Sequence, residues 1–327
     1  MSDDHGSLLH VVRADGAGTS LDHLGALLSS RAEDLQNKLF LHGGLLFRGF
    51  DVESPIHFKR VLSDIFPGSM LQPYVGGVGF KRRVSSAVYT STEVPASLTI
   101  SPHNELAHLP GAPPFVSFFC QQPASSGGRT SLVCGKDLYQ HMPLSIRDLF
   151  ESKGVKYSRV YRPPGLIRRL GIQHPLAVSW SDVFESDEPS EVERRCLEKG
   201  LTVRWRDGGV LETSIVLPAV IKHPKTSAPL WFNQAHTFLP TPGSVGQLFY
   251  GIYKVLWRFP SLRQGEAWFG TGEKIPMSVV DEIHKTIKQH QRFVEWQRGD
   301  VLVLDNYRLL HGREAYRGKR KVFAAML

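Results

Sequence analysis

Three residues in two short motifs have the types and spacing to bind one metal ion. His103 and Glu105 stand two positions apart, and His311 follows far along the chain. On a β-strand, side chains at i and i+2 leave the same face, with Cα atoms roughly 6.6–7 Å apart. Two imidazoles and a carboxylate cover one face of an octahedron and leave three positions open, which is typical of non-haem Fe(II) oxygenases. The spacing therefore predicts a metal centre that activates dioxygen.

A histidine–acid pair alone is weak evidence for a metal site. With 31 acidic residues and 14 histidines among 327 residues, about one His-x-Asp/Glu pair is expected by chance. A solvated pair in a loop is therefore the competing interpretation of His103 and Glu105. The metal hypothesis depends on what surrounds the pair and on His311.

A site of this kind also needs a reductant such as 2-oxoglutarate, whose distal carboxylate requires a cation. Arginine is the usual choice, because its planar guanidinium binds a carboxylate with two parallel hydrogen bonds. Arg320 follows His311 at the start of the last predicted strand, so both could line one barrel interior. Thr130, just after the Gly127-Gly128 turn, could add a hydroxyl to the same carboxylate. For Arg320 taken alone, a solvated place in the basic run 317–321 is the alternative.

Two further residues are candidates for substrate contact. Arg313 shares a face with His311 on an extended segment and could bind a substrate carboxylate. Asn233 lies in a Trp-Phe-Asn-Gln-Ala-His segment, 231–236, that could face the pocket. A surface arginine and a buried structural asparagine are the respective alternatives.

The hydrophobic pattern predicts many short strands, with helices mainly at the ends and in insertions. Apolar residues at helical spacing and capping signals indicate helices at about 20–39, 54–66, 143–153, 190–200 and 276–290. Strands are predicted at 43–49, 115–120, 130–134, 154–161, 201–205, 210–216, 220–223, 230–233, 293–297, 301–305 and 320–327. Such closely spaced strands favour a mostly-β jelly roll with flanking helices over an alternating βαβ fold.

We expect one domain over residues 1–327. Residues 1–100 should form a helical flank and loops that cover the site, and residues 101–327 should form the jelly-roll core. A proline-rich stretch places an insertion near 162–200.

Composition narrows the class of protein. The content of 41% hydrophobic and 21% charged residues is that of a globular protein. The apolar runs are too short to cross a bilayer, and the first residues are acidic where a signal peptide would be basic. The three cysteines are not spaced as in a metal-binding motif. We therefore expect a cytoplasmic protein. The basic residues behind the net charge of +8 are scattered along the sequence, and no nucleic-acid-binding signature accompanies them. Binding of an anionic small molecule, or of an acidic carrier protein, explains this positive charge better than nucleic-acid binding does.

The combined motifs resemble the taurine dioxygenase family of Fe(II)/2-oxoglutarate enzymes. The resemblance covers roughly residues 40–327 and depends on His-Asn-Glu at 103–105, Gly-Gly-Arg-Thr at 127–130 and Asp-Asn…His-Gly-Arg…Arg at 305–320. Segments 89–93 and 231–236 are more similar to the syringomycin-type (SyrP-like) amino-acid hydroxylase branch. The resemblance implies a double-stranded β-helix of the clavaminate synthase-like type.

The resemblance also implies the roles of the site residues. His103, Glu105 and His311 are expected to bind Fe(II), and Arg320 and Thr130 to bind the far carboxylate of 2-oxoglutarate, with O₂ as second cosubstrate. In taurine dioxygenase itself a further arginine of the last strand binds the sulfonate. That position is Ala324 here, so a sulfonate substrate is not expected.

The expected reaction is the oxidation of an unactivated C–H bond in a small polar substrate, an amino acid or a derivative, free or bound to an acyl or peptidyl carrier. Hydroxylation with release of succinate and CO₂ is the first choice, and desaturation or oxidative cyclisation on the same iron is the alternative. A zinc hydrolase with the same ligands and a catalytically inactive binding module remain open. A homo-oligomer also remains open.

Overall fold

The computed structural model describes residues 8–14, 16, 18–77, 81–85, 87–91, 94–165, 179–256 and 265–327. Its helices are α1 (Leu21–His42), α2 (Pro55–Ile65), α3 (Gly135–His141), α4 (Leu144–Lys153), α6 (Trp180–Phe184), α7 (Pro189–Glu198), α8 (Ala235–Phe238), α9 (Pro242–Val245), α10 (Gln247–Leu256) and α11 (Met277–Gln289). Its strands are β1 (His10–Arg13), β2 (Gly44–Arg48), β3 (Arg83–Ser85), β4 (Val88–Thr90), β5 (Ile100–His103), β6 (Phe115–Gln122), β7 (Ser126–Gly127), β8 (Thr130–Cys134), β9 (Val155–Tyr161), β10 (Thr202–Arg206), β11 (Val210–Leu217), β12 (Val220–Lys222), β13 (Pro229–Trp231), β14 (Gly265–Phe269), β15 (Arg292–Val294), β16 (Val301–Asp305), β17 (Leu309–Arg313), β18 (Tyr316–Arg317) and β19 (Lys321–Met326).

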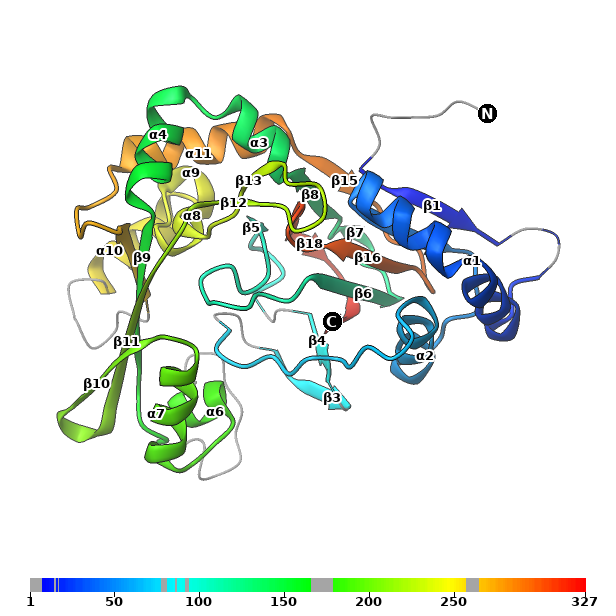
Figure 1. Cartoon of the computed structure of the whole chain (residues 1–327), viewed down its shortest axis with the longest axis horizontal. Coiled ribbons are helices and arrows are strands. Elements are labelled where there is room, and N and C mark those ends of the chain that lie inside the picture. Colours follow the sequence, from blue (N-terminus) through cyan, green and yellow to red (C-terminus); the bar gives the residue numbers. More distant parts are fainter. Residues whose placement is uncertain are drawn as a thin grey trace.

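Two sheets form the centre of the fold (Figure 1). The larger has the strand order β1-β2-β16-β6-β19-β4-β3, and the smaller has the order β15-β8-β17-β5. Neighbours in these sheets are often far apart in sequence, as β2 is from β16 and β5 is from β17. This is the double-stranded β-helix expected from the sequence, and it gathers residues of both chain halves.

Strand β16 shows how the larger sheet buries both of its faces. Val301 and Val303 pack in one apolar cluster with α1 and α2, whereas Leu302 and Leu304 pack in a second cluster on the opposite face. A strand buried on both sides has a continuous apolar sequence, which is what the sequence has here. The helices α1 and α2 therefore cover the outer face of this sheet.

The smaller sheet is built in the same way. On β8, Leu132 and Cys134 join the cluster that lies between the sheets, while Val133 joins a cluster with α3, α4 and α11. On β17, Leu309 faces the inner cluster and Leu310 the outer one. Because residues two apart on a strand face the same side, His311 points between the two sheets, as Leu309 does.

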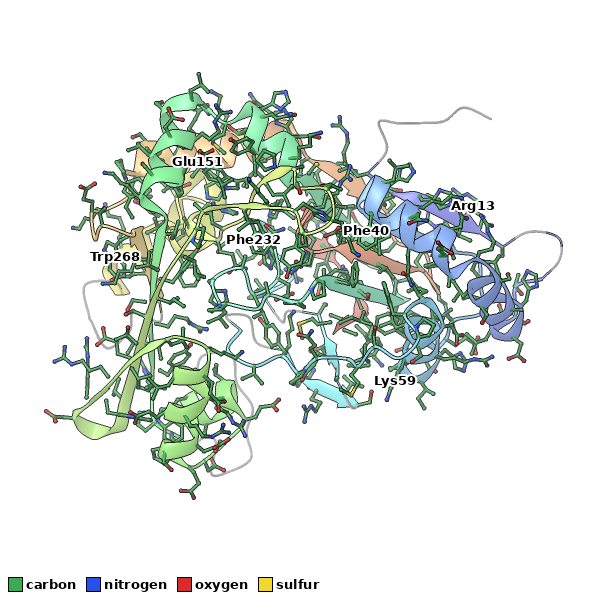
Figure 2. All side chains as sticks on the ribbon, viewed as in Figure 1. Arg13, Phe40, Lys59, Glu151, Phe232 and Trp268 are labelled. Atoms are coloured by element: carbon green, nitrogen blue, oxygen red, sulfur yellow. The ribbon has the colours of Figure 1, made fainter. Side chains whose placement is uncertain are left out.

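The outer surfaces of the helices carry polar residues together with a few exposed apolar side chains, such as Ile56 on α2. Lys59 on α2 and Glu151 on α4 are exposed, whereas Phe232 lies in the buried interior (Figure 2). In the described part of the chain, no helix is long and apolar enough to span a membrane.

Most predicted helices are present, and their caps explain where two of them begin. Ser20 and Ser54 each accept a hydrogen bond from a backbone N–H of the first turn of α1 and α2. The helix predicted at about 190–200 is present, but the capping signal in its sequence forms no side-chain cap. Helix α7 starts earlier, at Pro189, with Glu188 as N-cap and without a side-chain cap, because proline at the first position fixes the start.

The chain also contains elements that the sequence pattern did not predict. The predicted loop region 67–100 contains the short strands β3 and β4, of which β4 pairs with β19. Strand β14 and helices α8 to α10 were likewise not predicted. Beside the jelly roll, β9 and β11 extend into a sheet with the order β10-β11-β9-β14, next to α6 and α7 (Figure 1). Part of the predicted insertion, residues 166–178, lies outside the described residues.

Candidate metal centre and adjoining pockets

His103 and His311 are direct cross-strand neighbours. They occupy the same register position of the antiparallel pair β5–β17, and their ring centroids are 4.7 Å apart. Gly312 allows this close pairing, because a Cβ at that position would lie 2.5 Å from the carbonyl oxygen of Ile100. Close approach of a neighbouring backbone is one of the roles that only glycine can fill.

Glu105 is positioned by a loop contact and not by the strand. Strand β5 ends at His103, so the i, i+2 strand geometry expected from the sequence does not apply. The backbone N–H of Glu105 donates to Oδ1 of Asn306 at 2.7 Å, and Nδ2 of Asn306 donates to the Glu105 carbonyl at 3.0 Å. Asn306 is fully buried, and it follows β16 directly. A buried amide thus sets where Glu105 points.

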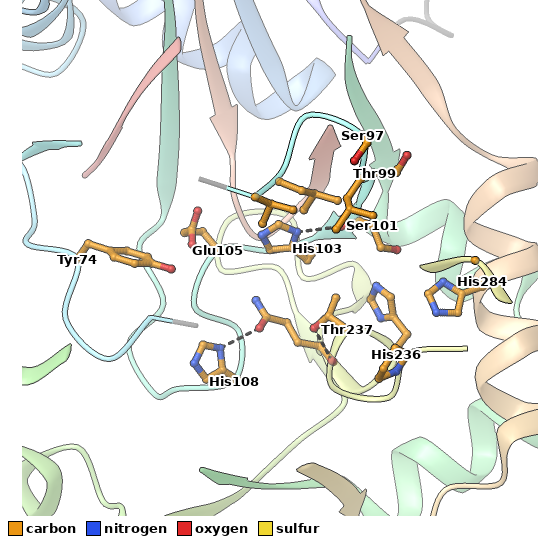
Figure 3. A pocket seen from close by; sticks show the side chains of 16 residues that line it. Tyr74, Ser97, Thr99, Ser101, His103, Glu105, His108, His236, Thr237 and His284 are labelled. Carbon is orange, nitrogen blue, oxygen red and sulfur yellow. Dashed lines mark hydrogen bonds between the residues drawn. The ribbon is translucent and has the colours of Figure 1, made fainter. Parts of the chain in front are cut away.

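The three side chains meet closely enough to hold one ion. One ligand atom from each of His103, Glu105 and His311 lies within 4.8 Å of the others, and Nε2 of His311 is 3.6 Å from Oε2 of Glu105. Nδ1 of His103 donates to the carbonyl of Ser101 at 2.9 Å, which leaves Nε2 as the lone-pair nitrogen (Figure 3). A carbonyl that accepts a hydrogen bond from the other ring nitrogen is the usual support for a metal-binding histidine.

The protonation states suit a cation. Burial, together with the nearby His311, lowers the pKa of His103 to about 4, so the imidazole is neutral at pH 7. Burial alone would raise the pKa of Glu105, but Lys81 and the two histidines together hold it well below its usual value. A neutral imidazole beside an ionised carboxylate is the donor set that a divalent transition metal binds. The described residues therefore fit an Fe(II) ion.

A small cavity leads from these side chains toward Arg320. Its volume is about 40 Å³, and it is lined by Lys81, Ser91, Ile100, His103, Glu105, Phe118, Thr130, His311, Gly312, Arg313, Arg320 and Val322. A space of this size holds a carboxylate group or about one water. Arg320 Nε donates to the Gly128 carbonyl at 3.2 Å, and within the described residues no carboxylate pairs with this guanidinium.

The electrostatics at the far end of the small cavity favour an anion. Burial lowers the pKa of Arg320 to about 10, and the positive charge of Arg313 adds to the effect. A poorly solvated guanidinium without an acidic partner is stabilised by a bound carboxylate. Thr130 Oγ1 accepts a hydrogen bond from Trp296 Nε1 at 3.0 Å, so its hydroxyl proton is available for another acceptor.

Arg313 lies in the same cavity wall, but both of its terminal nitrogens donate hydrogen bonds within the protein. Nη1 donates to the Val94 carbonyl, and Nη2 donates to the carbonyls of Pro95 and Leu98 at 2.9 and 2.7 Å. Arg313 therefore holds the segment 94–98 in place. That segment forms part of the wall of a larger pocket.

The larger pocket opens on the other side of His103 and Glu105 and has a volume of about 560 Å³ (Figure 3). Its described lining is Tyr74, Val94, Ser97, Leu98, Thr99, Ile100, Ser101, His103, Glu105, His108, Gln234, His236, Thr237, Pro240, Gly246 and His284. His108 Nδ1 donates to Gln234 Oε1 at 2.8 Å, and Gln234 in turn donates to the carbonyl of Asn104, inside the His-Asn-Glu motif. The pocket wall and the metal motif are thus one hydrogen-bonded unit.

The other candidate, Asn233, does not line this pocket. Its Nδ2 donates to the Ala219 carbonyl at 3.1 Å and its Oδ1 accepts from the backbone N–H of Ala235, at the start of α8. The neighbours Gln234 and His236 line the pocket instead. Asn233 therefore holds the backbone at the start of α8, and the structure does not favour its direct contact with a substrate.

Sequence reasoning did not assign three residues that the structure brings to the site: Lys81, Trp296 and Asn306. Lys81 and Trp296 reach it from segments without a recognisable motif. Asn306 stands next to Asp305 in the quoted C-terminal motif, and a polar pair directly after a buried strand was the signal that could have identified it.

Comparison with known proteins agrees with this geometry. The model of the family described as taurine catabolism dioxygenase TauD, TfdA matches residues 6–326. The dapdiamide synthesis protein DdaC of Enterobacter agglomerans is 28% identical over 319 residues, which cover 93% of this chain and 91% of that protein. A clavaminate synthase-like protein of Arabidopsis thaliana is 28% identical over 298 residues, covering 89% and 83%.

Solved structures show the same fold at lower identity. The PvcB protein from Pseudomonas aeruginosa matches with a TM-score of 0.52 at 14% identity, covering 97% of this chain and 84% of that one. A second structure of PvcB, described as an Fe, alpha-ketoglutarate dependent oxygenase, gives a TM-score of 0.51 at 16% identity and covers 97% and 85%. The chain belongs to the TauD, TfdA family and is an Fe(II)/2-oxoglutarate-dependent oxygenase with a His103, Glu105 and His311 triad.

Proposed function

We propose that this oxygenase oxidises an unactivated C–H bond of a small polar substrate, an amino acid or amino-acid derivative, by hydroxylation. One observation carries the proposal. His103, Glu105 and His311 meet at the junction of two cavities, a small one that ends at Arg320 and a large one that could hold a substrate. The far end of the small cavity thus suits the distal carboxylate of the cosubstrate, and the large cavity suits the molecule to be oxidised.

The chain's own residues have separate tasks in this proposal. His103, Glu105 and His311 hold the iron, and Arg320 and Thr130 bind the distal carboxylate of 2-oxoglutarate. Iron, with 2-oxoglutarate and dioxygen, supplies the oxidising power that cleaves the C–H bond while succinate and CO₂ are released. The protein contributes ligation, orientation and a site from which bulk water is excluded.

The lining of the larger pocket bears on the substrate class. A volume of about 560 Å³ is in the range of pockets for drug-sized molecules. Among its described lining residues, Glu105 is the sole carboxylate, and we assign that group to the metal. An ammonium group would therefore lack an acidic partner there, whereas an acylated amine would need none. The pocket favours an amino-acid derivative over a free amino acid.

The names of the relatives agree with a role in small-molecule synthesis. One relative is named for dapdiamide synthesis, and PvcB is described as part of an isonitrile synthetic pathway. A derivative bound to an acyl or peptidyl carrier remains part of the proposal, and the net charge of +8 suits an acidic carrier. The similarity to the syringomycin-type branch, the single domain over 1–327 and a homo-oligomer stay predictions.

Desaturation or oxidative cyclisation is the alternative outcome on the same iron, since both begin with the same C–H cleavage. A zinc hydrolase is more remote. Hydrolysis does not need a half-buried guanidinium such as Arg320, which has no acidic partner among the described residues.

The test is an anaerobic titration of the Fe(II)·2-oxoglutarate enzyme with matched sets of three substrates, followed by turnover in air. Each set comprises a free amino acid, its N-acyl derivative and the same residue as a carrier thioester. We expect derivatives to perturb the metal-to-ligand charge-transfer band and to increase succinate release, with a product heavier by one oxygen atom. Turnover supported by Zn(II) without 2-oxoglutarate would instead establish the hydrolase.

A further inference from the structure

A lysine that belongs to neither metal-binding motif contacts the carboxylate of the metal triad. Lys81 Nζ lies 2.7 Å from Glu105 Oε2, and the side chains of both residues are almost fully buried, at 3% and 5% exposure. The ammonium also lies over the ring of Tyr74, 4.2 Å from its centroid. Lys81 lines the small cavity and Tyr74 lines the large one, so the ammonium stands where the two cavities meet.

The oxygen that Lys81 contacts is the one that faces the other metal ligands. Oε2 of Glu105 is also the atom 3.6 Å from His311 Nε2. An iron held by the triad and the ammonium of Lys81 would therefore share one carboxylate oxygen. This is different from a surface ion pair, whose partners have water as an alternative.

Burial increases the energetic importance of the contact between Lys81 and Glu105. A buried ammonium needs a partner, and removing one member of a buried ion pair leaves the other charge uncompensated. For Glu105 this means that Lys81 offsets its charge when the divalent cation is absent. When the cation is present, the ammonium and the cation repel each other across the shared oxygen.

We propose that Lys81 is a positioning residue for Glu105: its ammonium holds the carboxylate through Oε2 and weakens the binding of the divalent metal. This inference rests on the proposed role of Glu105 as a metal ligand. The ammonium stabilises the carboxylate before metal binding, keeps one of its oxygens hydrogen-bonded and competes with the metal for its negative charge. Metal affinity at this site is thereby set by a group outside the triad.

The experiment compares Lys81→Met with Arg82→Met in the full-length protein. Both variants lose one positive charge from the same segment, but Arg82 is exposed and Lys81 is buried against Glu105. Affinity for Mn(II) is measured without turnover, from the electron paramagnetic resonance signal of the free ion. Melting temperatures are recorded with and without the metal.

Lys81→Met is expected to increase the affinity for Mn(II) and to decrease the stability of the metal-free protein. Lys81→Met binds Mn(II) at least about tenfold more tightly, because the competing ammonium is gone. The same variant melts several degrees lower without metal, because the charge of Glu105 is left uncompensated, and saturating Mn(II) raises its melting temperature by more than it raises that of the wild type. Arg82→Met matches the wild type in Mn(II) affinity, because Arg82 is exposed.

Weaker Mn(II) binding by Lys81→Met would overturn the inference, since it would mean that the ammonium supports metal binding. Equal changes in both variants would also overturn it, since they would reflect net charge alone. The wild type separates this inference from the proposed function. If wild-type protein forms an Fe(II)·2-oxoglutarate charge-transfer band and releases succinate, the proposed function stands whatever Lys81→Met does.

The charge-transfer band of Lys81→Met gives a second readout. Without the ammonium, Glu105 gives more electron density to iron, so the band shifts to longer wavelength. A purely structural role of Lys81 would leave the band energy unchanged.

Discussion

His103 and His311 face each other at one register position of the β5–β17 pair, although they lie in opposite halves of the chain. Their rings are 4.7 Å apart because the two backbones approach closely at Gly312. The metal centre therefore depends on the separation of two strands as much as on the identity of its ligands.

Gly312→Ala tests this dependence on strand separation. The added methyl group would lie 2.5 Å from the Ile100 carbonyl and 2.7 Å from Ser131 Oγ, so β5 has to move away from β17. We expect a loss of roughly 1–3 kcal/mol in the free energy of unfolding, as for other overpacked sites. Metal affinity should fall at the same time. Denaturant titration and Mn(II) binding measure the two effects, and an unchanged affinity would contradict the role given to Gly312.

Arg320→Gln tests the cosubstrate site. A glutamine keeps a hydrogen-bond donor but removes the charge that would face the distal carboxylate. The expected loss is about 2–3 kcal/mol of 2-oxoglutarate binding, or roughly 30- to 150-fold in Kd. Mn(II) affinity should change much less, since Arg320 is not a ligand. Arg317→Gln, an exposed position in the same basic run, is the matched control.

Asn306→Ala tests how Glu105 is held. The substitution removes two donated hydrogen bonds, to the carbonyls of Glu105 and Pro113, and the acceptor for the Glu105 N–H. Loss of a residue that orients a metal ligand typically lowers metal affinity by about 10- to 100-fold. Calorimetric Mn(II) titration measures this, and circular dichroism at the same temperature verifies that the variant is folded. Wild-type affinity in folded Asn306→Ala would show that Glu105 is oriented by other contacts.

His236 gives a prediction for pH. Burial lowers its pKa to about 3, below the ordinary value near 6.5, so the unfolded chain binds one more proton in this interval. Stability is therefore complete above about pH 6.5 and is lost as the pH falls toward 3. At pH 5 the loss from this single group is about 2 kcal/mol.

A substitution isolates the contribution of His236 to this pH dependence. In His236→Asn the difference in unfolding free energy between pH 7 and pH 5 should be smaller than in the wild type by about 2 kcal/mol. His141→Asn removes an exposed imidazole and serves as the control. An unchanged pH dependence in His236→Asn would mean that this histidine does not stay neutral in the folded protein.

The sequence predicted several strands of the two central sheets because their apolar pattern is continuous, whereas β5 and β17, which carry His103 and His311, lie outside the predicted strand ranges. β6, β8 and β16 are buried on both faces, and such runs are read directly from the residues. Ser20 and Ser54 indicated the starts of α1 and α2 for a different reason, because the first N–H groups of a helix need a local hydrogen-bond acceptor. These features depend on short-range chemistry alone.

Other parts of the site depend on contacts between distant segments, which no local pattern encodes. Lys81 lies in a segment without a clear period, and its importance appears only once it meets Glu105. The importance of Trp296 likewise appears only through its hydrogen bond to Thr130, 166 residues away in the chain. Asn233 and Arg313 were plausible substrate contacts by type, but their side chains bond to nearby carbonyls and amides.

The most direct test of the account is an anaerobic titration of the full-length protein with Fe(II) and 2-oxoglutarate, recorded in the visible spectrum for the wild type and for His311→Ala. We predict a charge-transfer band in the wild type and none in His311→Ala, with both proteins folded by circular dichroism. A band of equal intensity in His311→Ala would contradict the assignment of the metal centre to His103, Glu105 and His311.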